Sequence, residues 1–367
     1  MKGKCGLYIH IPFCSSKCLY CDFFSNADNN AEIDTYISNM IKAIKNYGEK
    51  YCRKVFDTIY IGGGTPSVVG TDNLAKIIRA AKRCFTIENA EITIEMNPRS
   101  AQQINFKSLY ELGVNRISLG VQSAVDNELK LLGRMHNNND VSTAVEMIRS
   151  NGIDNISLDL MVGIARQTEH SLKRSMDFCI ALNPKHISAY ILKVEENTPY
   201  HKLAPSLNLP DDDRQAELYK FMQGYLTSNG YEQYEISNFA KRGFESRHNT
   251  KYWNCDEYLG LGASAHSMMD GRRFYFPRSN EDFYNNKYVS DGEGATSEEY
   301  IMLRLRLREG LHFIEYEKLF NQALPQKCAN VAKKYEKYGL TCVDNEKIIL
   351  TEKGFLLSNS IIAEMLE

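Results

Sequence analysis

The sequence predicts an α/β protein built on a partial (β/α)6 barrel, followed by an α+β C-terminal region that ends in a small winged-helix-like module. Strand-like runs rich in Ile, Val, Leu and Tyr alternate with helix-like segments through the first half of the chain. This alternation favours a parallel sheet with helices outside it. Chemically unusual residues also follow each run, as expected at the carboxyl ends of barrel strands.

Six runs are predicted to be strands, at residues 7–11, 58–61, 91–96, 116–121, 155–162 and 186–194. Several of them are apolar with little alternation, as strands buried on both faces should be. Segments with apolar residues at helical spacing lie between them, at residues 33–47, 73–84, 141–149 and 172–182. Because six units are fewer than the eight of a closed barrel, we expect an open barrel whose cleft admits a large ligand.

The residues that follow the predicted strands form one pattern. A cysteine-rich loop follows the first strand, and a glycine-rich turn at residues 62–66 follows the second. Because the carboxyl ends of parallel strands meet at one end of a barrel, we expect the groups there to face one site. The polar residues at or after the other strand ends are Glu95, Gln122, Asp159, Glu195 and Glu196.

The pattern changes after about residue 209. Residues 211–228 are predicted to form an amphipathic helix whose acidic start suits its positive N-terminal end, and residues 231–236 a strand. From residue 297 we expect three helices, a hairpin around Asp344 and Asn345, and a last helix at residues 354–365. The chain is thus predicted to comprise a barrel at residues 1–205, a region covering its cleft at residues 206–295 and the small module at residues 296–367.

Composition narrows the function classes. The net charge of −2 gives no overall basic field, so we expect no binding to nucleic acid. No run of about 18 apolar residues and no signal-peptide pattern is present, which predicts a cytoplasmic protein without a transmembrane segment. Peripheral membrane contact stays compatible with this composition.

Ten cysteines in a cytoplasmic protein are expected to be reduced thiols or metal ligands. Those that stand alone in apolar or helical stretches are expected to lie in the core. They are Cys52, Cys84, Cys179, Cys328 and Cys342.

Cys14, Cys18 and Cys21 form a C-x3-C-x2-C motif in the loop after the first strand. Three thiolates so close in sequence can hold a compact [4Fe–4S] cluster in one loop. Three protein ligands leave one iron open, and the amine and carboxylate of S-adenosylmethionine (SAM) can chelate that iron. The reduced cluster can then pass an electron to the SAM sulfonium. The protein has to position the cluster and SAM and to tune the reduction potential of the cluster.

Two other interpretations of the motif remain open. A structural zinc site needs four closed ligands, and Cys5 or His10 could supply the fourth, although the second cysteine pair usual in such sites is missing. Buried thiols without a metal are the other alternative, which a short polar loop disfavours.

The motif resembles the signature of the radical SAM enzymes, in which an aromatic residue, here Tyr20, precedes the last cysteine. The wider strings at residues 8–14 and 21–23 are similar to the coproporphyrinogen-oxidase-like branch of that family. The resemblance covers nearly the whole chain, because it continues at residues 62–66, 115–123, 248–253 and 357–359.

The resemblance implies roles for individual residues. Tyr8, Tyr20 and Glu95 would lie beside the SAM bound to the cluster. A glycine-rich turn also lets backbone groups approach a ligand closely, and an arginine can pair with a ligand carboxylate. Residues 163–168 lack the Pro-Gly usual in this loop of the family, which leaves the loop's shape open. The positions that match the lining of a second SAM in related oxidases are Gly64, Thr65, Gln122, Arg134 and Asp159.

Two functions follow from the resemblance. One is a heme chaperone that takes heme from a donor and delivers it to recipient hemoproteins. The other is an oxygen-independent coproporphyrinogen III oxidase, which forms protoporphyrinogen IX by oxidative decarboxylation. The oxidases place a further cysteine shortly after the third one, where this sequence has Asp22 and Phe23. They also carry an N-terminal extension, whereas the first strand here is expected at about residue 7, and both features favour the chaperone.

The His248-Asn-x-x-Tyr252-Trp253 motif is typical of the chaperones in this branch. Histidine is a common axial ligand of heme iron, so His248 is a candidate heme contact. A packing role is an alternative of at least equal weight. In it, His248 and Trp253 would pack the junction between the barrel and the C-terminal region.

Overall fold

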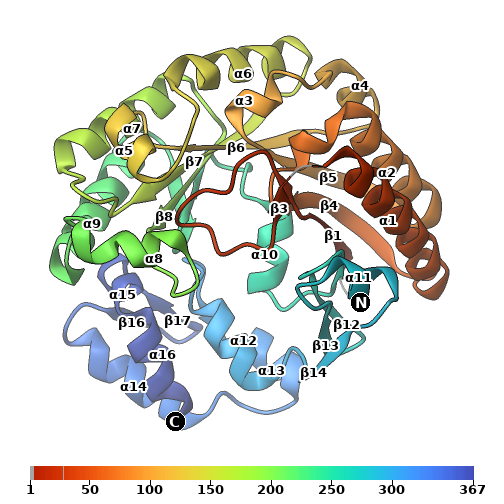
Figure 1. Ribbon diagram of the computed structural model, residues 1–367. Helices are drawn as coiled ribbons and strands as arrows, with labels where there is room; N and C mark the ends of the chain where they lie inside the picture. The colour runs from red at the N-terminus through yellow and green to blue at the C-terminus, as the bar shows by residue number, and fades with distance from the viewer. Residues whose placement is uncertain (1–3, 28) are drawn as a thin grey trace.

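The centre of the fold is a run of six parallel strands (Figure 1), seen in a computed structural model that describes residues 4–27 and 29–367. Each of the six predicted strands is present, so the partial (β/α)6 barrel is confirmed. In their order across the sheet they are β1 Cys5–Ile11, β4 Val55–Gly63, β5 Thr86–Met96, β6 Arg116–Gln122, β7 Asn155–Val162 and β8 His186–Ile191.

The two faces of these strands differ in chemistry. On β6, Ile117 and Leu119 are fully buried in the hydrophobic core that the strands share with the outer helices. The alternating residues Arg116 and Ser118 belong to the other face, the inside of the barrel, because successive side chains of a strand point to opposite sides. Ser118 has Glu95 and Ser157 as its neighbours in register, so the inside of the barrel is polar.

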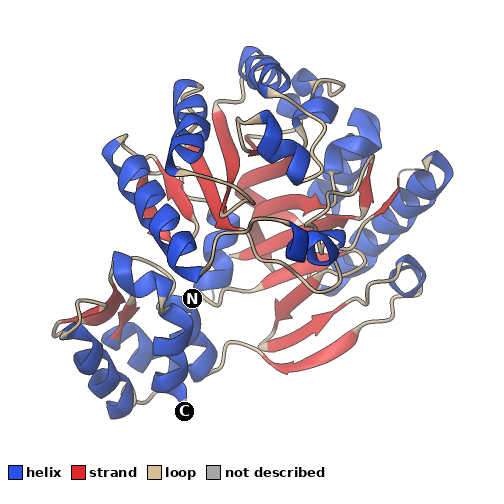
Figure 2. Ribbon diagram, turned by 60° about the vertical axis from the view of Figure 1, so that its left-hand side comes forward, coloured by secondary structure: helices blue, strands red, loops and turns tan. Residues whose placement is uncertain are grey.

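Long helices cover the outer face of the parallel strands, as predicted (Figure 2). They are α1 Asn30–Lys50, α2 Gly70–Cys84, α6 Asn138–Ser150 and α7 Glu169–Ala181. Three short helices were not predicted from the sequence, since each has six residues or fewer: α3 Pro98–Ala101, α4 Phe106–Glu111 and α5 Asp126–Leu131.

The strands of the C-terminal region extend both edges of the barrel sheet, giving twelve strands among the described residues. β11 Tyr258–Leu261 runs parallel to β1 and is followed outward by β12 His266–Met269, β13 Arg272–Tyr275 and β14 Val289–Glu293. At the other edge β10 Asn238–Ala240 pairs antiparallel with β8, and β9 Glu232–Glu235 pairs with β10. The helices of this part are α8 Pro199–Leu203, α9 Asp212–Ser228, α10 Arg247–Trp253 and α11 Asn280–Tyr284.

A small module with its own hydrophobic core ends the chain, beside the barrel (Figures 1 and 2). The predicted hairpin is present as β16 and β17, but the predicted last helix is two helices, because the backbone leaves helical geometry at Leu357 (φ −109°, ψ 13°). The module consists of α12 Ser297–Arg304, β15 Leu311–His312, α13 Phe313–Phe320, α14 Gln326–Glu336, β16 Thr341–Val343, β17 Lys347–Leu350, α15 Glu352–Leu356 and α16 Ser358–Leu366.

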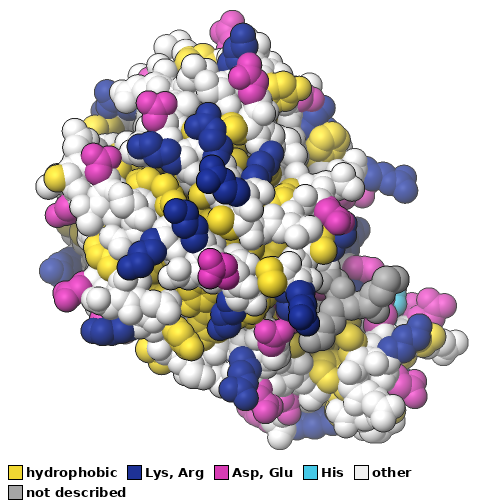
Figure 3. Space-filling model, turned by 90° about the vertical axis from the view of Figure 1, so that its right-hand side faces the viewer, with side chains coloured by type: hydrophobic (Ala, Val, Ile, Leu, Met, Phe, Trp, Pro, Cys, Tyr) yellow, Lys and Arg dark blue, Asp and Glu magenta, His cyan; other side chains and the backbone are white. Residues whose placement is uncertain are grey.

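Lys and Arg side chains gather on the face formed by α1 and α2 (Figure 3). Six exposed cations of these helices form no ion pair with any described residue. This face is therefore basic although the net charge of the chain is −2. The six are Lys42, Lys45, Lys76, Arg79, Lys82 and Arg83.

Two of the isolated cysteines were placed wrongly by the sequence. Cys52 and Cys342 are exposed, whereas Cys179 and Cys328 lie in the core as expected. Among the helices in the described part of the chain, none combines the length and the apolar character needed to cross a bilayer.

Candidate functional site

The cysteine loop follows β1 and rests on the glycine-rich turn after β4. Its first residues form β2 Phe13–Cys14, which pairs with β3 Asn26–Ala27 and so closes the loop at its base. The N–H of Gly64 donates to the carbonyl of Ile11 at 2.9 Å, and the N–H of Thr65 donates to that of Phe13 at 2.7 Å. A Cβ at Gly64 would lie 2.6 Å from the Phe13 carbonyl oxygen, so the close approach of the two loops requires glycine there.

Leu19 anchors the tip of the same loop. Its N–H donates to the carbonyl of Leu132 at 3.2 Å, and its carbonyl accepts from the N–H of Tyr200 at 2.9 Å. Gly133 has a φ of +72°, and a Cβ there would lie 2.9 Å from Cγ of Leu19. The loop is therefore held between the turn after β4, the end of α5 and the start of α8.

The three thiols of the motif are partly exposed and interact electrostatically with one another. Burial raises the pKa of Cys18 and of Cys21, and the neighbouring Cys14 thiol adds to the rise in both. Sγ of Cys14 is 3.4 Å from Oγ1 of Thr65. Cys18 and Thr65 line one cavity of about 540 Å³ together with Arg134, so the cysteine loop borders, through Cys18, a space that can take a small-molecule cofactor.

The candidates for a fourth zinc ligand are engaged elsewhere. Cys5 lies at the opposite end of β1, where its Sγ is 3.6 Å from a carboxylate oxygen of Glu257. Nε2 of His10 donates to the Phe24 carbonyl at 3.0 Å, and Nδ1 accepts from the Tyr8 hydroxyl at 2.9 Å. Within residues 4–27 and 29–367, no group of three or more His, Cys, Asp or Glu side chains converges on one metal ion. The donor set thus lacks the closed tetrahedral arrangement of structural zinc.

The same donor set fits an iron–sulfur cluster. Three soft thiolate donors on one loop match the ligands of such clusters, and the missing fourth protein ligand matches a cluster with one open iron. Cys14, Cys18 and Cys21 would hold the cluster, with the cavity beside them free for SAM.

Tyr20 and Arg134 form a pair at the edge of this cavity. Nη2 of Arg134 donates to the Tyr20 hydroxyl at 2.6 Å, and the guanidinium carbon lies 5.7 Å from the Tyr20 ring centroid. Gln122 is close by, since a Cβ on Gly120 would approach Nε2 of Gln122 to 2.9 Å and Nη2 of Arg134 to 3.4 Å. Gln122 ends β6 in the left-handed region (φ +67°), a strained conformation of the kind found at ligand sites.

Glu95 lies at the end of β5 with both carboxylate oxygens bonded. The Tyr60 hydroxyl donates to Oε1 at 2.6 Å, and the Gly63 N–H donates to Oε2 at 3.0 Å. The pKa of Glu95 is raised from 4.5 to about 7, because burial outweighs these two hydrogen bonds. A carboxylate in this state ionises readily when a cationic ligand arrives.

Asp159 faces Glu95 across the inside of the barrel, near enough for the two carboxyl groups to repel each other. It accepts hydrogen bonds from the Ser118 hydroxyl at 3.1 and 3.2 Å and from the Ser157 hydroxyl at 3.3 Å. Burial raises its pKa against these hydrogen bonds. Two carboxyl groups with raised pKa values therefore lie inside the barrel.

Gln167 shapes the loop after β7 that lacks the Pro-Gly pair. Its Oε1 accepts from the Gly163 N–H at 2.7 Å, and its Nε2 donates to the Met161 carbonyl at 3.2 Å. The positive φ values of Gly163 (+83°) and Arg166 (+63°) complete the turn. The Gln167 side chain thus stabilises this loop through its hydrogen bonds to the backbone.

Among the predicted site residues, His248 does not lie at the end of the barrel that carries the cysteine loop. It is buried on α10, at the opposite end of the strands from the cysteine loop. Nδ1 lies 2.7 Å from the Thr58 hydroxyl, and Nε2 lies 2.8 Å from the Tyr252 hydroxyl. Burial lowers the pKa of His248 to about 3, so the ring is neutral. This placement favours the packing role.

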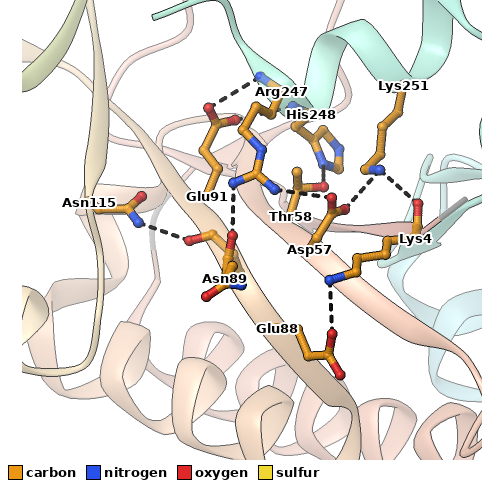
Figure 4. Close-up of polar contacts among 11 residues, drawn as sticks. Lys4, Asp57, Thr58, Glu88, Asn89, Glu91, Asn115, Arg247, His248 and Lys251 are labelled. Atoms are coloured by element: carbon orange, nitrogen blue, oxygen red, sulfur yellow. Dashed lines mark hydrogen bonds and ion pairs between the residues drawn. The ribbon is translucent and has the colours of Figure 1, made fainter. Parts of the chain in front are cut away.

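Polar contacts join α10 to the N-terminal ends of β4 and β5 (Figure 4). Glu91 accepts from the N–H groups of Arg247 and His248 at 3.2 and 3.1 Å, which satisfies two free donors at the start of the helix. Asp57 pairs with Arg247 at 3.0 Å and with Lys251 at 2.8 Å. These contacts hold α10 against the N-terminal ends of the barrel strands.

Sequence reasoning missed two residues inside the barrel, Tyr60 and Arg116. The signal for Tyr60 was its place two residues before Gly62 on a predicted strand, which puts both on one face. Arg116 is 2% exposed, and its Nε and Nη1 form no hydrogen bond with the described residues. It interacts electrostatically with Glu91 and Asp159, so it is the internal counter-charge to the carboxylates.

The comparisons with known proteins agree with this geometry. Residues 8–179 match the model of the Radical SAM superfamily, and residues 297–357 match that of the HemN C-terminal domain. The structure resembles coproporphyrinogen III oxidase (HemN) from Escherichia coli, described as a radical SAM enzyme, with a TM-score of 0.85. That similarity covers 99% of this chain and 90% of the other at 21% identity, and it establishes the fold.

Relatives of higher identity extend over the whole chain. The heme chaperone HemW of Bacillus subtilis (strain 168) is 34% identical over 98% of both chains. That of Escherichia coli (strain K12) is 35% identical over 97% of both chains. The chain belongs to the HemW family of the radical SAM superfamily.

Proposed function

We propose that this protein is a heme chaperone that binds heme as cargo and delivers it to recipient hemoproteins. The observation that carries the proposal is the similarity to relatives described as heme chaperone HemW, which runs through 98% of both chains at 34% identity. Membership of the radical SAM superfamily implies a [4Fe–4S] cluster and SAM as cofactors. We propose a cytoplasmic location, with a heme donor and recipient hemoproteins as partners.

We further infer how the chain's residues hold these cofactors. Cys14, Cys18 and Cys21 would hold the cluster, and SAM would bind beside it. When bound, the cluster would supply an electron for chemistry on SAM. The residues proposed to contact SAM are Tyr8, Tyr20, Gly64, Thr65, Glu95, Gln122, Arg134 and Asp159.

The residue after the last cluster cysteine supports the chaperone over the oxidase. Related oxidases place a further cysteine shortly after the third one, and here that stretch begins with Asp22. Asp22 accepts hydrogen bonds from Arg278 at 2.8 and 3.3 Å, so its carboxylate serves as a tie to the segment after β13. The shared fold is compatible with either activity and does not decide between them.

Heme ligation by His248 stays a prediction. In this geometry a heme iron could bind Nε2 only after Tyr252 releases it, since the two atoms are 2.8 Å apart. Both residues belong to α10, so a heme contact at His248 requires the Tyr252 side chain to turn away from the buried imidazole.

Two assays on the anaerobically reconstituted protein test the proposal. In the first, the protein is loaded with heme, separated from free heme and mixed with an apo-hemoprotein such as apomyoglobin. Transfer faster than from an equal amount of heme bound to serum albumin is expected. In the second, coproporphyrinogen III, SAM and a strong reductant are added, and porphyrins are separated by chromatography. Multiple turnovers to protoporphyrin, or failure to bind heme at all, would contradict the chaperone role.

A further inference from the structure

We propose that Tyr60 is a positioning residue of the SAM site, which fixes the Glu95 carboxylate in the orientation that SAM meets. No motif of the sequence pointed to Tyr60. The inference rests on the proposed function, because it takes Glu95 as a SAM contact.

The contact between the two side chains is short and has a second point of support. The Tyr60 hydroxyl donates to Oε1 of Glu95 at 2.6 Å, and the Gly63 N–H donates to Oε2 at 3.0 Å. A Cβ on Gly62 would lie 2.8 Å from Oε2, so any side chain at position 62 would displace the carboxylate. With one donor on each oxygen, the carboxylate plane cannot rotate freely.

Tyr60 is itself immobilised. It is 8% exposed, and its ring stacks on the His248 ring with centroids 5.1 Å apart. The Tyr8 ring lies beside it, tilted, with the two centroids 6.2 Å apart. His248 is bonded through both ring nitrogens to Thr58 and Tyr252. The contacts of His248 at the N-terminal ends of the strands therefore hold the Tyr60 ring in place, and the Tyr60 hydroxyl in turn holds the Glu95 carboxylate.

A fixed carboxylate favours ligand binding for a physical reason. A free carboxylate at a strand end would have to be ordered when the ligand binds, at a cost in side-chain entropy. In this arrangement folding has already ordered it. Removing the Tyr60 hydroxyl also takes a donor from a buried carboxylate, so Oε1 loses the contact that orients it.

The test compares Tyr60→Phe with wild type after cluster reconstitution. Dissociation constants for SAM are measured by anaerobic equilibrium dialysis, and the change that SAM causes in the electron paramagnetic resonance spectrum of the reduced cluster is recorded. We expect SAM affinity about tenfold weaker in Tyr60→Phe, with iron content unchanged and a cooperative unfolding transition retained. Tyr110→Phe is the control, because Tyr110 lies on α4, is 49% exposed and forms no hydrogen bond with Glu95.

A double-mutant cycle separates positioning from a general packing effect. Glu95→Gln should weaken SAM binding, and adding Tyr60→Phe to it should cause no further loss, because the hydroxyl acts only through the carboxylate. Losses that add in the double variant would overturn the inference. Equal SAM affinity of wild type and Tyr60→Phe would overturn it too, while leaving the proposed function intact. Absence of SAM binding by wild type would instead remove the proposed cofactor and this inference with it.

Discussion

The guanidinium group of Arg134 donates a 2.6 Å hydrogen bond to the hydroxyl of Tyr20, which stands between Cys18 and Cys21 in the sequence. The contact ties the segment between α5 and α6 to the cysteine loop. Nε of Arg134 is buried and forms no hydrogen bond within the described residues, so the side chain has a donor left for a ligand. An arginine with these properties suits the carboxylate of SAM.

Arg134→Met should therefore weaken SAM binding about tenfold or more, because it removes a charged donor and keeps the bulk of the side chain. Iron content should stay the same, since the proposed cluster ligands are Cys14, Cys18 and Cys21. Equilibrium dialysis with reconstituted protein measures the first effect and iron analysis the second. Arg99→Met is the control, because exposed Arg99 lines the same cavity and has no contact with Tyr20. A loss as large in Arg99→Met would show a general charge effect.

Gly64→Ala should disturb the cysteine loop. The added Cβ would lie 2.6 Å from the Phe13 carbonyl oxygen and 3.0 Å from that of Ile11, and neither backbone atom can move without shifting the loop. We expect a loss of about 1–3 kcal/mol in unfolding free energy and a lower iron content after reconstitution. Denaturant titration and iron analysis measure both. Gly224→Ala, inside α9 with open space around the site, should leave both intact or raise the stability slightly. Normal iron content in Gly64→Ala would contradict the close packing of the two loops.

The raised pKa of Glu95 predicts a pH dependence of stability. Its folded value of about 7 lies above the unfolded value of 4.5, so between these values the folded protein binds the proton that the unfolded chain has lost. Relative to Glu95→Gln, wild type should therefore lose stability as pH rises through this window and change little above it. Denaturation of both proteins at about pH 5 and about pH 8 tests the sign. A difference that does not change, or that grows in favour of wild type, would contradict the assignment.

Four buried histidines predict the opposite trend. Burial lowers the pKa of His10 and His136 to about 4, that of His248 to about 3 and that of His186 well below its usual range, from 6.5 in the unfolded chain. Below pH 6.5 the unfolded chain takes up protons that the folded protein does not, so this stability is lost as pH falls. His136→Gln keeps a donor for the Val121 carbonyl, which Nε2 contacts at 2.9 Å, and should flatten the acid limb of the stability profile. An unchanged acid limb would show that His136 is charged in the fold.

The features of the fold that depend on local sequence patterns could be predicted. The apolar run at residues 155–162 coincides with β7, and the three cysteines are adjacent because one short loop carries them. The Tyr60–Glu95 contact could not be predicted, since it depends on the register between β4 and β5. The position of His248 depends on where α10 returns to the barrel, and no local pattern encodes that. The domain limits at residues 205 and 295 stay a prediction, while strands from the second part join both edges of the barrel sheet.

The most direct test of the account is the cluster site itself. Cys14→Ala should lose the brown colour, the broad visible absorption and the iron of the reconstituted wild type, while its circular dichroism spectrum and melting transition show an intact fold. Cys342→Ala, which removes an exposed thiol from the C-terminal module, should keep the full cluster. If Cys14→Ala instead retains a full-strength [4Fe–4S] spectrum, the assignment of Cys14, Cys18 and Cys21 as the cluster ligands is wrong.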